Sequence, residues 1–185
     1  MKNNNFRFAF FAVAAIFCIA SFFSFSANSQ RRDHLTEAEG ELVREAQELD
    51  RRTEVFVKAV ERRFLVLNNA AQPDDKKVKK EAEKWGELPK GTRGQLLLDI
   101  EKILQEAVDN IDNVAERDAK SELLPNAVRI LSAASQKFLL QLKAQLDKTN
   151  TEIERGAILG AIDYCNQVIE ASAKLPKEEK KKKKS

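Results

Sequence analysis

The side chains that most often carry catalysis or bind metal ions are scarce in this chain of 185 residues. It has one histidine, His34, and two cysteines, Cys18 and Cys165. Transition-metal and haem sites need several such ligands at set spacings, and the sequence contains no HxxxH, ExxH, CxxC or CxxCH segment. It also lacks a GxSxG motif and a glycine-rich phosphate loop. We therefore expect no catalytic residue, no cofactor and no metal, and predict that the protein is not an enzyme.

The lone histidine and the cysteine of the main domain each have a simple structural interpretation. His34 precedes the first predicted helix, and a frayed terminus cannot hold a general base in a fixed geometry. We expect it to be exposed. Cys165 lies between Ile162 and Ile169 on an apolar stripe, which predicts a small buried side chain. The alternative is an intermolecular disulfide, because Cys18 falls in the N-terminal apolar run and leaves Cys165 without an internal partner.

The first 30 residues have the composition of a secretory signal peptide. Lys2 and Arg7 are the only charges before the 18 uncharged positions 8–25, and small residues follow. Cleavage is predicted after Ser26 or Ser29, so that residues 1–29 form the signal. The alternative is an uncleaved anchor formed by residues 8–25, because about 17–25 apolar residues span a bilayer. In both cases the charge bias places the rest of the chain outside the cytoplasm, in the periplasm or secreted.

Charge is distributed unevenly along the chain. The formal net charge is +3, but residues 1–29 carry two basic side chains, and residues 177–185 carry six lysines and two glutamates. Residues 30–176 therefore have a net charge of −3. A mildly acidic domain of this kind does not predict specific nucleic-acid recognition.

Lysine clusters and the single tryptophan are the clearest indications of a binding function. Consecutive lysines at 180–184 repel one another and predict a disordered tail, 177–185. Such a tail either binds anionic phospholipids and other envelope polyanions or aids solubility. Trp85 lies in a turn-rich segment, as a partner-binding anchor or as a side chain that pins this segment to the domain. The candidate contacts are Trp85, Lys76, Lys77, Lys79, Lys80, Lys180, Lys181, Lys182, Lys183 and Lys184.

Heptad spacing predicts a long first helix. Thr36 and Glu39 have the spacing of a capping box. The stripe that follows is interrupted where Glu39 and Arg63 occupy apolar positions. Its seven-residue repeats indicate one face of a bundle, or a coiled-coil seam that pairs with a second copy of the chain. The stripe consists of Leu35, Leu42, Ala46, Leu49, Thr53, Phe56, Val60 and Leu67.

Three further amphipathic helices follow. One begins at Thr92, which forms a second capping box with Gln95. The next begins near Ser121, its predicted N-cap, and the last begins at about 149–151. Gly156 and Gly160 on the last helix predict a flat strip that a neighbouring backbone approaches. The three apolar stripes are Leu97, Ile100, Leu104, Ala107, Ile111 and Val114; Val128, Leu131, Ser135, Phe138, Leu142 and Leu146; and Ile158, Ala161, Ile162, Cys165, Val168 and Ile169.

The connection after the first long helix, at about 68–91, is too long to be without structure in a compact domain. A Pro-Asp-Asp start at position 73 and Gly86 at the end predict a short helix at about 74–85. The other connections are short, which favours antiparallel neighbours. The predicted fold is therefore all-α, an antiparallel up-down four-helix bundle over residues 30–176, with a short extra helix in the first long connection.

These features predict a secreted or periplasmic helical protein that acts as an interaction or structural module of the cell envelope. Its partner is an unidentified protein, or a second copy of the chain. The alternative is a protein that associates with a polyanion or a membrane surface through its lysine-rich tail. The two hypotheses differ in their response to salt, because binding by lysines is screened and docking through apolar surface is not.

Overall fold

A computed structural model describes residues 33–69 and 82–176, and this part of the chain is helical without any strand. The all-α prediction is thus confirmed. The predicted signal peptide, most of the predicted helix at 74–85 and the lysine-rich tail lie outside the described residues. A helical turn at 82–85 is described. The longer helices are α2 (Glu37–Glu45), α3 (Leu49–Leu67), α5 (Arg93–Arg117), α6 (Leu123–Leu146) and α7 (Glu152–Ala173).

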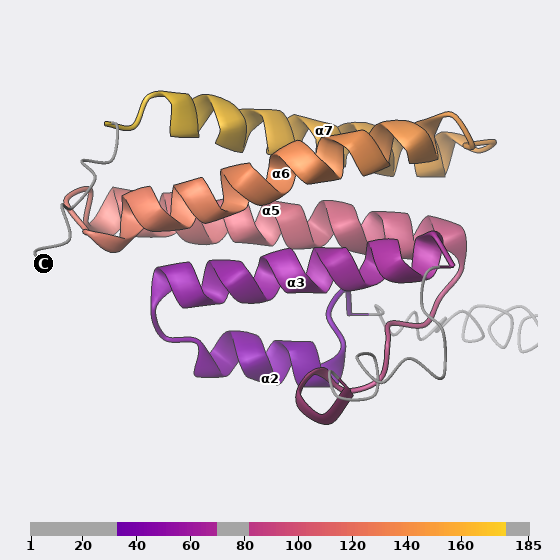
Figure 1. Cartoon of the computed structure of the whole chain (residues 1–185), viewed down its shortest axis with the longest axis horizontal. Helices are drawn as coiled ribbons and strands as arrows, with labels where there is room; N and C mark the ends of the chain where they lie inside the picture. Colours follow the sequence, from indigo (N-terminus) through magenta and orange to yellow (C-terminus); the bar gives the residue numbers. More distant parts are fainter. Residues whose placement is uncertain (1–32, 70–81, 177–185) are drawn as a thin grey trace, which may run out of the picture. The chain divides into compact units, whose positions relative to one another are not determined.

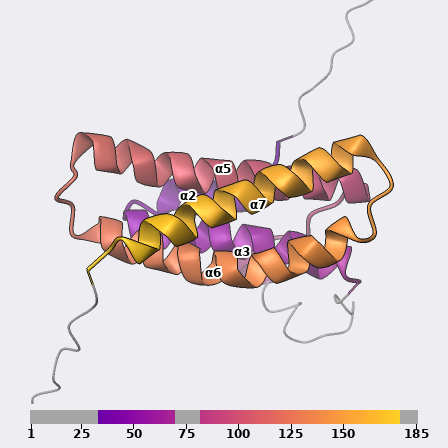
Figure 2. The same cartoon turned by 90° about the horizontal axis from the view of Figure 1, so that it is seen from above.

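Helices α5 and α6 lie between α3 on one side and α7 on the other (Figure 1). Both α3 and α7 pack against α5 and against α6, whereas α3 and α7 do not meet. Figure 2 shows the same arrangement from above, with α7 lying across α5 and α6. The connection 118–122 makes α5 and α6 antiparallel, but these two helices contact each other only sparsely. A short connection therefore sets their direction, while their apolar faces turn toward α3 and α7.

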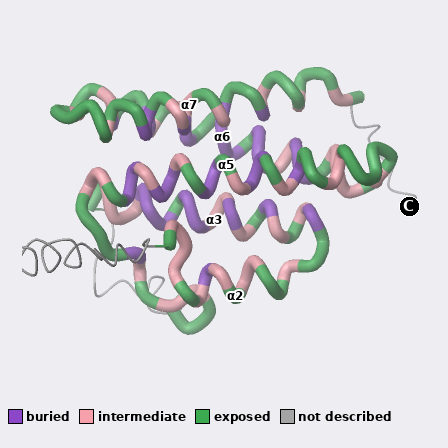
Figure 3. Tube along the Cα trace, turned by 180° about the vertical axis from the view of Figure 1, so that it is seen from behind, coloured by how far each residue is buried: buried purple, intermediate pink, exposed green. Residues whose placement is uncertain are grey.

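The predicted apolar stripes form the core. Figure 3 shows buried residues on the facing sides of α3, α5 and α6. Phe64 of α3 and Phe138 of α6 pack with their ring centroids 5.7 Å apart, and Ile100, Ile158 and Leu142 are fully buried. Each such side chain contributes about 1.5–3 kcal/mol by leaving water. No helix in the described part of the chain has both the length and the apolar character to cross a bilayer.

Three of the predicted helix starts are confirmed. Thr36 with Glu39 and Thr92 with Gln95 form complete capping boxes, in which each side chain bonds the other residue's backbone N–H. Thr151 accepts from the backbone N–H of Glu154. The predicted cap at Ser121 is wrong, because α6 begins one residue later and its N-cap residue makes no side-chain capping bond.

The predicted single helix over the first stripe is also wrong. Helix α2 ends at Glu45, the chain turns, and α2 lies beside α3 (Figure 1). Arg52 Nε holds this turn by donating to the carbonyl of Ala46 at 3.0 Å. The fold-back brings Glu39 to Arg63, with 2.6 Å between Oε1 and Nη1. In one continuous helix, these residues would lie about 36 Å apart. The two residues that interrupt the stripe are therefore partners.

The two glycines of α7 do not have the role that the sequence predicted for them. A Cβ at Gly160 would meet the Glu101 side chain, and a Cβ at Gly156 would meet nothing within 4 Å. The predicted approach of a neighbouring backbone is therefore wrong. Gly86 ends its helical turn as predicted, with its N–H donating to the carbonyl of Ala82 at 3.0 Å. Its φ of +66° and the closeness of Ala38 both require glycine at this position.

Candidate functional site

A buried ion network joins α2 to α3. Glu39 Oε1 accepts from Arg62 Nη1 at 2.8 Å and from Arg63 Nη1 at 2.6 Å. The side chains are 0%, 3% and 1% exposed, respectively. One carboxylate thus serves two guanidinium groups, and the three side chains sum to one positive charge. Charges taken out of water to this degree need further polar partners to be stable.

Backbone carbonyl groups provide those further partners. Arg62 donates to the carbonyl oxygens of Trp85, Gly86 and Glu87 at 2.8, 2.9 and 2.6 Å. Three consecutive carbonyl groups are therefore held by one buried side chain. Arg63 donates in the same way to the carbonyl of His34 at 2.6 Å. The network consequently fixes both the segment 85–87 and the start of the described chain on α3.

The Trp85 ring lies against two cations. The guanidinium carbon of Arg62 and the Lys84 ammonium each lie 5.9 Å from the ring centroid. This distance permits cation–π attraction, which is worth about 0.5–1 kcal/mol at a partly exposed site. The carbonyl group of Trp85 is bound by Arg62, in agreement with the interpretation that this segment is pinned to the domain. The ring itself is half-buried and lines a groove, as a partner-binding anchor would.

That groove lies between α2, α3 and the helical turn at 82–85, and has a volume of about 320 Å³. This volume is at the lower end of the range for ligand-binding clefts, about 300–1,000 Å³. Side chains of both charges surround its apolar part, and Arg51 pairs with Glu54 there at 3.2 Å. No histidine is among the described residues that line the groove. The lining residues are Leu42, Glu45, Ala46, Arg51, Glu54, Val55, Lys84 and Trp85.

The prediction that His34 is a frayed, exposed residue is wrong. Its Nε2 lies 2.7 Å from Glu106 Oε2 on α5, and its Nδ1 lies 3.5 Å from Asp33 Oδ1. The imidazole is partly buried, and the backbone carbonyl is held by Arg63. His34 therefore attaches the start of the described chain to α3 and α5.

The buried interpretation of Cys165 is confirmed, since the residue is 0% exposed in the core. Burial raises the pKa of its thiol to about 11, and the neighbouring Ser135 side chain offsets only part of this shift. A buried, protonated thiol is a poor nucleophile. This position does not favour the intermolecular disulfide that an unpaired cysteine suggested.

One of the predicted contact residues, Trp85, belongs to the described part of the chain. Trp85 lines the groove, whereas Lys76, Lys77, Lys79, Lys80 and the lysines at 180–184 lie outside the described residues. Sequence reasoning missed Glu39, Arg62 and Arg63 as a network. The available signal was the pair of opposite charges, Glu39 and Arg63, in apolar positions of the same stripe.

The described residues contain no group of three histidine, cysteine, aspartate or glutamate side chains placed to hold a metal ion. The groove beside Trp85 is the candidate site, and its apolar and charged side chains are of the kinds that bind a partner noncovalently. Comparison with protein-family models, curated proteins and solved structures finds no match to this chain.

Proposed function

We propose that the protein is a secreted or periplasmic, non-enzymatic interaction module of the cell envelope, and that it docks a protein partner in the groove beside Trp85. The observation that carries this proposal is the hold of Arg62 on three consecutive carbonyl groups, those of Trp85, Gly86 and Glu87. A loop fixed before binding loses little conformational entropy on binding. Tryptophan is also among the residues that contribute most to interface affinity.

We infer that α3, α5, α7 and α6 form a four-helix bundle in that order around its axis, with α2 on the outside. The contacts of α3 and of α7 with both central helices support this inference. In such a fold the bundle is the support and α2 is the added element. The groove then lies between the support and α2, where Glu39 fixes the spacing of the two helices.

The groove favours an amphipathic protein segment as its occupant. Leu42, Val55 and the Trp85 ring provide apolar surface, while Glu45 and Lys84 provide charges of opposite sign. A polyanion would meet the glutamates of this groove as well as its cations. A protein segment with apolar and mixed charged side chains meets complementary groups along the whole groove.

Placement of the protein outside the cytoplasm rests on residues 1–29 and has its own test. We expect the protein isolated from an extracytoplasmic fraction to begin at Ala27 or Gln30, as N-terminal sequencing would show. A chain that retains Met1 in the membrane fraction would support the anchor formed by residues 8–25. A cytoplasmic chain with an intact N-terminus would contradict both forms of the proposal.

Site-specific photo-crosslinking tests the docking groove. A photoreactive amino acid at Glu54, an exposed residue of the groove, should form an adduct with one protein in the native host. The same amino acid at Lys137, exposed on α6, is the matched control. We expect Trp85→Ala to abolish the adduct at position 54, and Trp85→Phe to retain part of it. Equal adducts at 54 and 137, or an adduct that Trp85→Ala leaves unchanged, would refute groove docking.

A further inference from the structure

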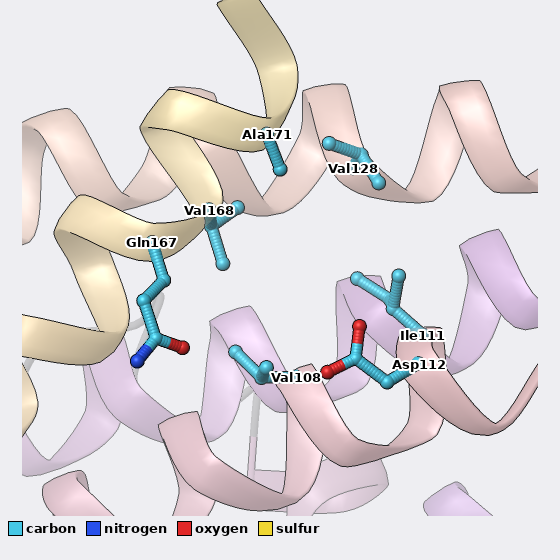
Figure 4. Close-up of a pocket in the computed structure, with 7 residues that line it drawn as sticks. All are labelled: Val108, Ile111, Asp112, Val128, Gln167, Val168 and Ala171. Atoms are coloured by element: carbon cyan, nitrogen blue, oxygen red, sulfur yellow. The ribbon is translucent and has the colours of Figure 1, made fainter. Parts of the chain in front are cut away.

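A second cavity lies away from the Trp85 groove, between α5, α6 and α7 (Figure 4). Its volume is about 90 Å³, well below the roughly 300 Å³ at which clefts for small-molecule ligands begin. A space of this size fits one side chain better than a separate metabolite. The lining residues are Val108, Ile111, Asp112, Val128, Gln167, Val168 and Ala171.

Polar groups of the cavity face each other from α5 and α7. Figure 4 shows the Asp112 carboxylate and the Gln167 carboxamide on either side of a valine-lined space. Gln167 Nε2 donates to Asp163 Oδ2 at 3.2 Å, so the Gln167 carbonyl oxygen is the group left to accept from an occupant. A carboxylate and a carbonyl oxygen both accept hydrogen bonds. The complementary occupant therefore supplies N–H donors, positive charge and an aliphatic part.

Negative charge is concentrated on this side of α5. Asp109, Asp112 and Glu116 follow one another at spacings of three and four residues, which places them on one helix face. Burial raises the pKa of Asp112, and the charges of Asp109 and Glu116 raise it further. The carboxylates repel one another in this arrangement. A cation bound beside Asp112 would relieve that repulsion.

The chain leaves α7 close to this cavity. Pro176, the last described residue, follows Ala171 of the cavity by five positions, and its carbonyl accepts from Arg129 Nη2 at 2.7 Å. Arg129 is the neighbour of Val128 in the cavity wall. Six of the next nine residues, 177–185, are lysines. An extended chain spans up to about 3.5 Å per residue, so residues 180–184 reach about 14–28 Å from Pro176.

We propose that this cavity and the acidic face of α5 bind the protein's own lysine-rich segment, 180–184. The aliphatic part of one lysine lies on Val108, Val128 and Val168, and its ammonium group donates to Asp112 and Gln167. Lysine is suited to such a site because its stem is apolar and its head is charged. The other lysines lie along Asp109 and Glu116.

The tether makes this weak contact significant. A short flexible linker gives an effective concentration on the order of 1 mM, so an interaction too weak for a separate peptide is populated within one molecule. Exposed ion pairs are screened over about 10 Å at 0.1 M salt. Docking of the segment is therefore expected at low salt and lost at high salt. A polyanion that captures the lysines would release the cavity.

Paramagnetic relaxation enhancement tests the proposal on the full chain as isolated. A nitroxide at Ser185→Cys in a chain with Cys18→Ser, with Cys165 buried and unlabelled, should broaden the methyl signals of Val108, Val128 and Val168 at about 20 mM salt. The methyl signals of Val66 on α3 are the internal control. Raising the salt to about 0.5 M should restore the broadened signals.

Variants of both sides complete the test. Replacement of the lysines at 180–184 by glutamine keeps the length of the tail and leaves every residue of the described core unchanged, and it should abolish the broadening at low salt. Asp112→Asn should weaken the broadening several-fold with an unchanged circular dichroism spectrum. Equal broadening of Val66, or none at the three valines, would overturn the proposal. Broadening seen only between nitroxide-labelled and separate isotope-labelled molecules would assign the cavity to a second copy, which also overturns it.

Discussion

Replacement of Glu39 by glutamine is the most direct test of how the Trp85 segment is held. The Glu39→Gln variant would keep the shape of the side chain and one acceptor oxygen, but would leave Arg62 and Arg63 buried without their carboxylate. Removal of one member of a buried ion pair costs about 3–5 kcal/mol. Because domains of this size are stable by about 5–15 kcal/mol, we expect about a fifth or more of the free energy of unfolding to be lost.

Urea unfolding followed by circular dichroism would measure this loss, and emission from the single tryptophan would report on the groove. We expect Glu39→Gln to lower the midpoint of thermal unfolding by about 10 °C and to shift Trp85 emission to the red. Glu41→Gln is the matched control on the same helix. Glu41 is 59% exposed and pairs with Arg44, and exposed pairs contribute less than about 1 kcal/mol. Equal losses in the two variants would refute a structural role for the buried network.

The same network predicts a different result when two of its three charges, Glu39 and Arg63, are replaced by apolar side chains. Arg63 Nε is buried without a hydrogen-bond partner among the described residues, so the network is not fully satisfied. Buried ion pairs replaced by apolar residues of similar size are often neutral or more stable. We expect Glu39→Leu with Arg63→Leu to retain helicity but to lose the fold-back, because the heptad stripe becomes continuous. Intramolecular crosslinking of α2 to α3 would detect that loss, and an unchanged crosslink would contradict it. Two smaller predictions concern α7. Because burial raises the pKa of Cys165 from 9.0 to about 11, the folded state holds its proton more tightly, and stability should fall as pH rises between these values. The loss should be about 2 kcal/mol by pH 11, measured by urea unfolding; Cys165→Ala should remove it, and an unchanged pH dependence in that variant would contradict the assignment. Gly156→Ala should stabilise α7 by about 1 kcal/mol, since a Cβ there meets nothing within 4 Å. Gly160→Ala should gain less in the same unfolding assay, because its Cβ displaces a carboxylate of α5; equal gains would refute this.

Local sequence signals predicted the helices well. The capping boxes at Thr36 and Thr92 depend on residues three positions apart, and both have the predicted geometry. The stripes at three- and four-residue spacing identified most of the core, including Cys165, because helical periodicity is a local property. Gly86 was recognised as the end of a helical turn for the same reason.

Tertiary contacts were beyond this kind of reasoning. The turn after Glu45 follows from an attraction between Glu39 and Arg63, which are 24 positions apart. A heptad count treats each of them as a separate defect in one helix. The hydrogen bond from Arg62 to the carbonyl of Trp85 joins residues more than 20 positions apart, so no local sequence pattern contains it. The Trp85 side chain was identified as a candidate, but the groove that it lines was not.

The interruptions of the first stripe explain why this chain forms α2 and α3 rather than one long helix. An uninterrupted apolar stripe would be satisfied equally well by pairing with a second copy of the chain. A buried glutamate cannot be satisfied in that way unless a cation is placed opposite it at the same level. Arg62 and Arg63 supply that cation within the chain. The fold-back pairs them with Glu39, whereas a straight helix would keep these charges apart. The same two arginines hold the carbonyl groups of His34 and Trp85. The charges that weaken the heptad pattern therefore specify the fold-back, and through it the position of the groove.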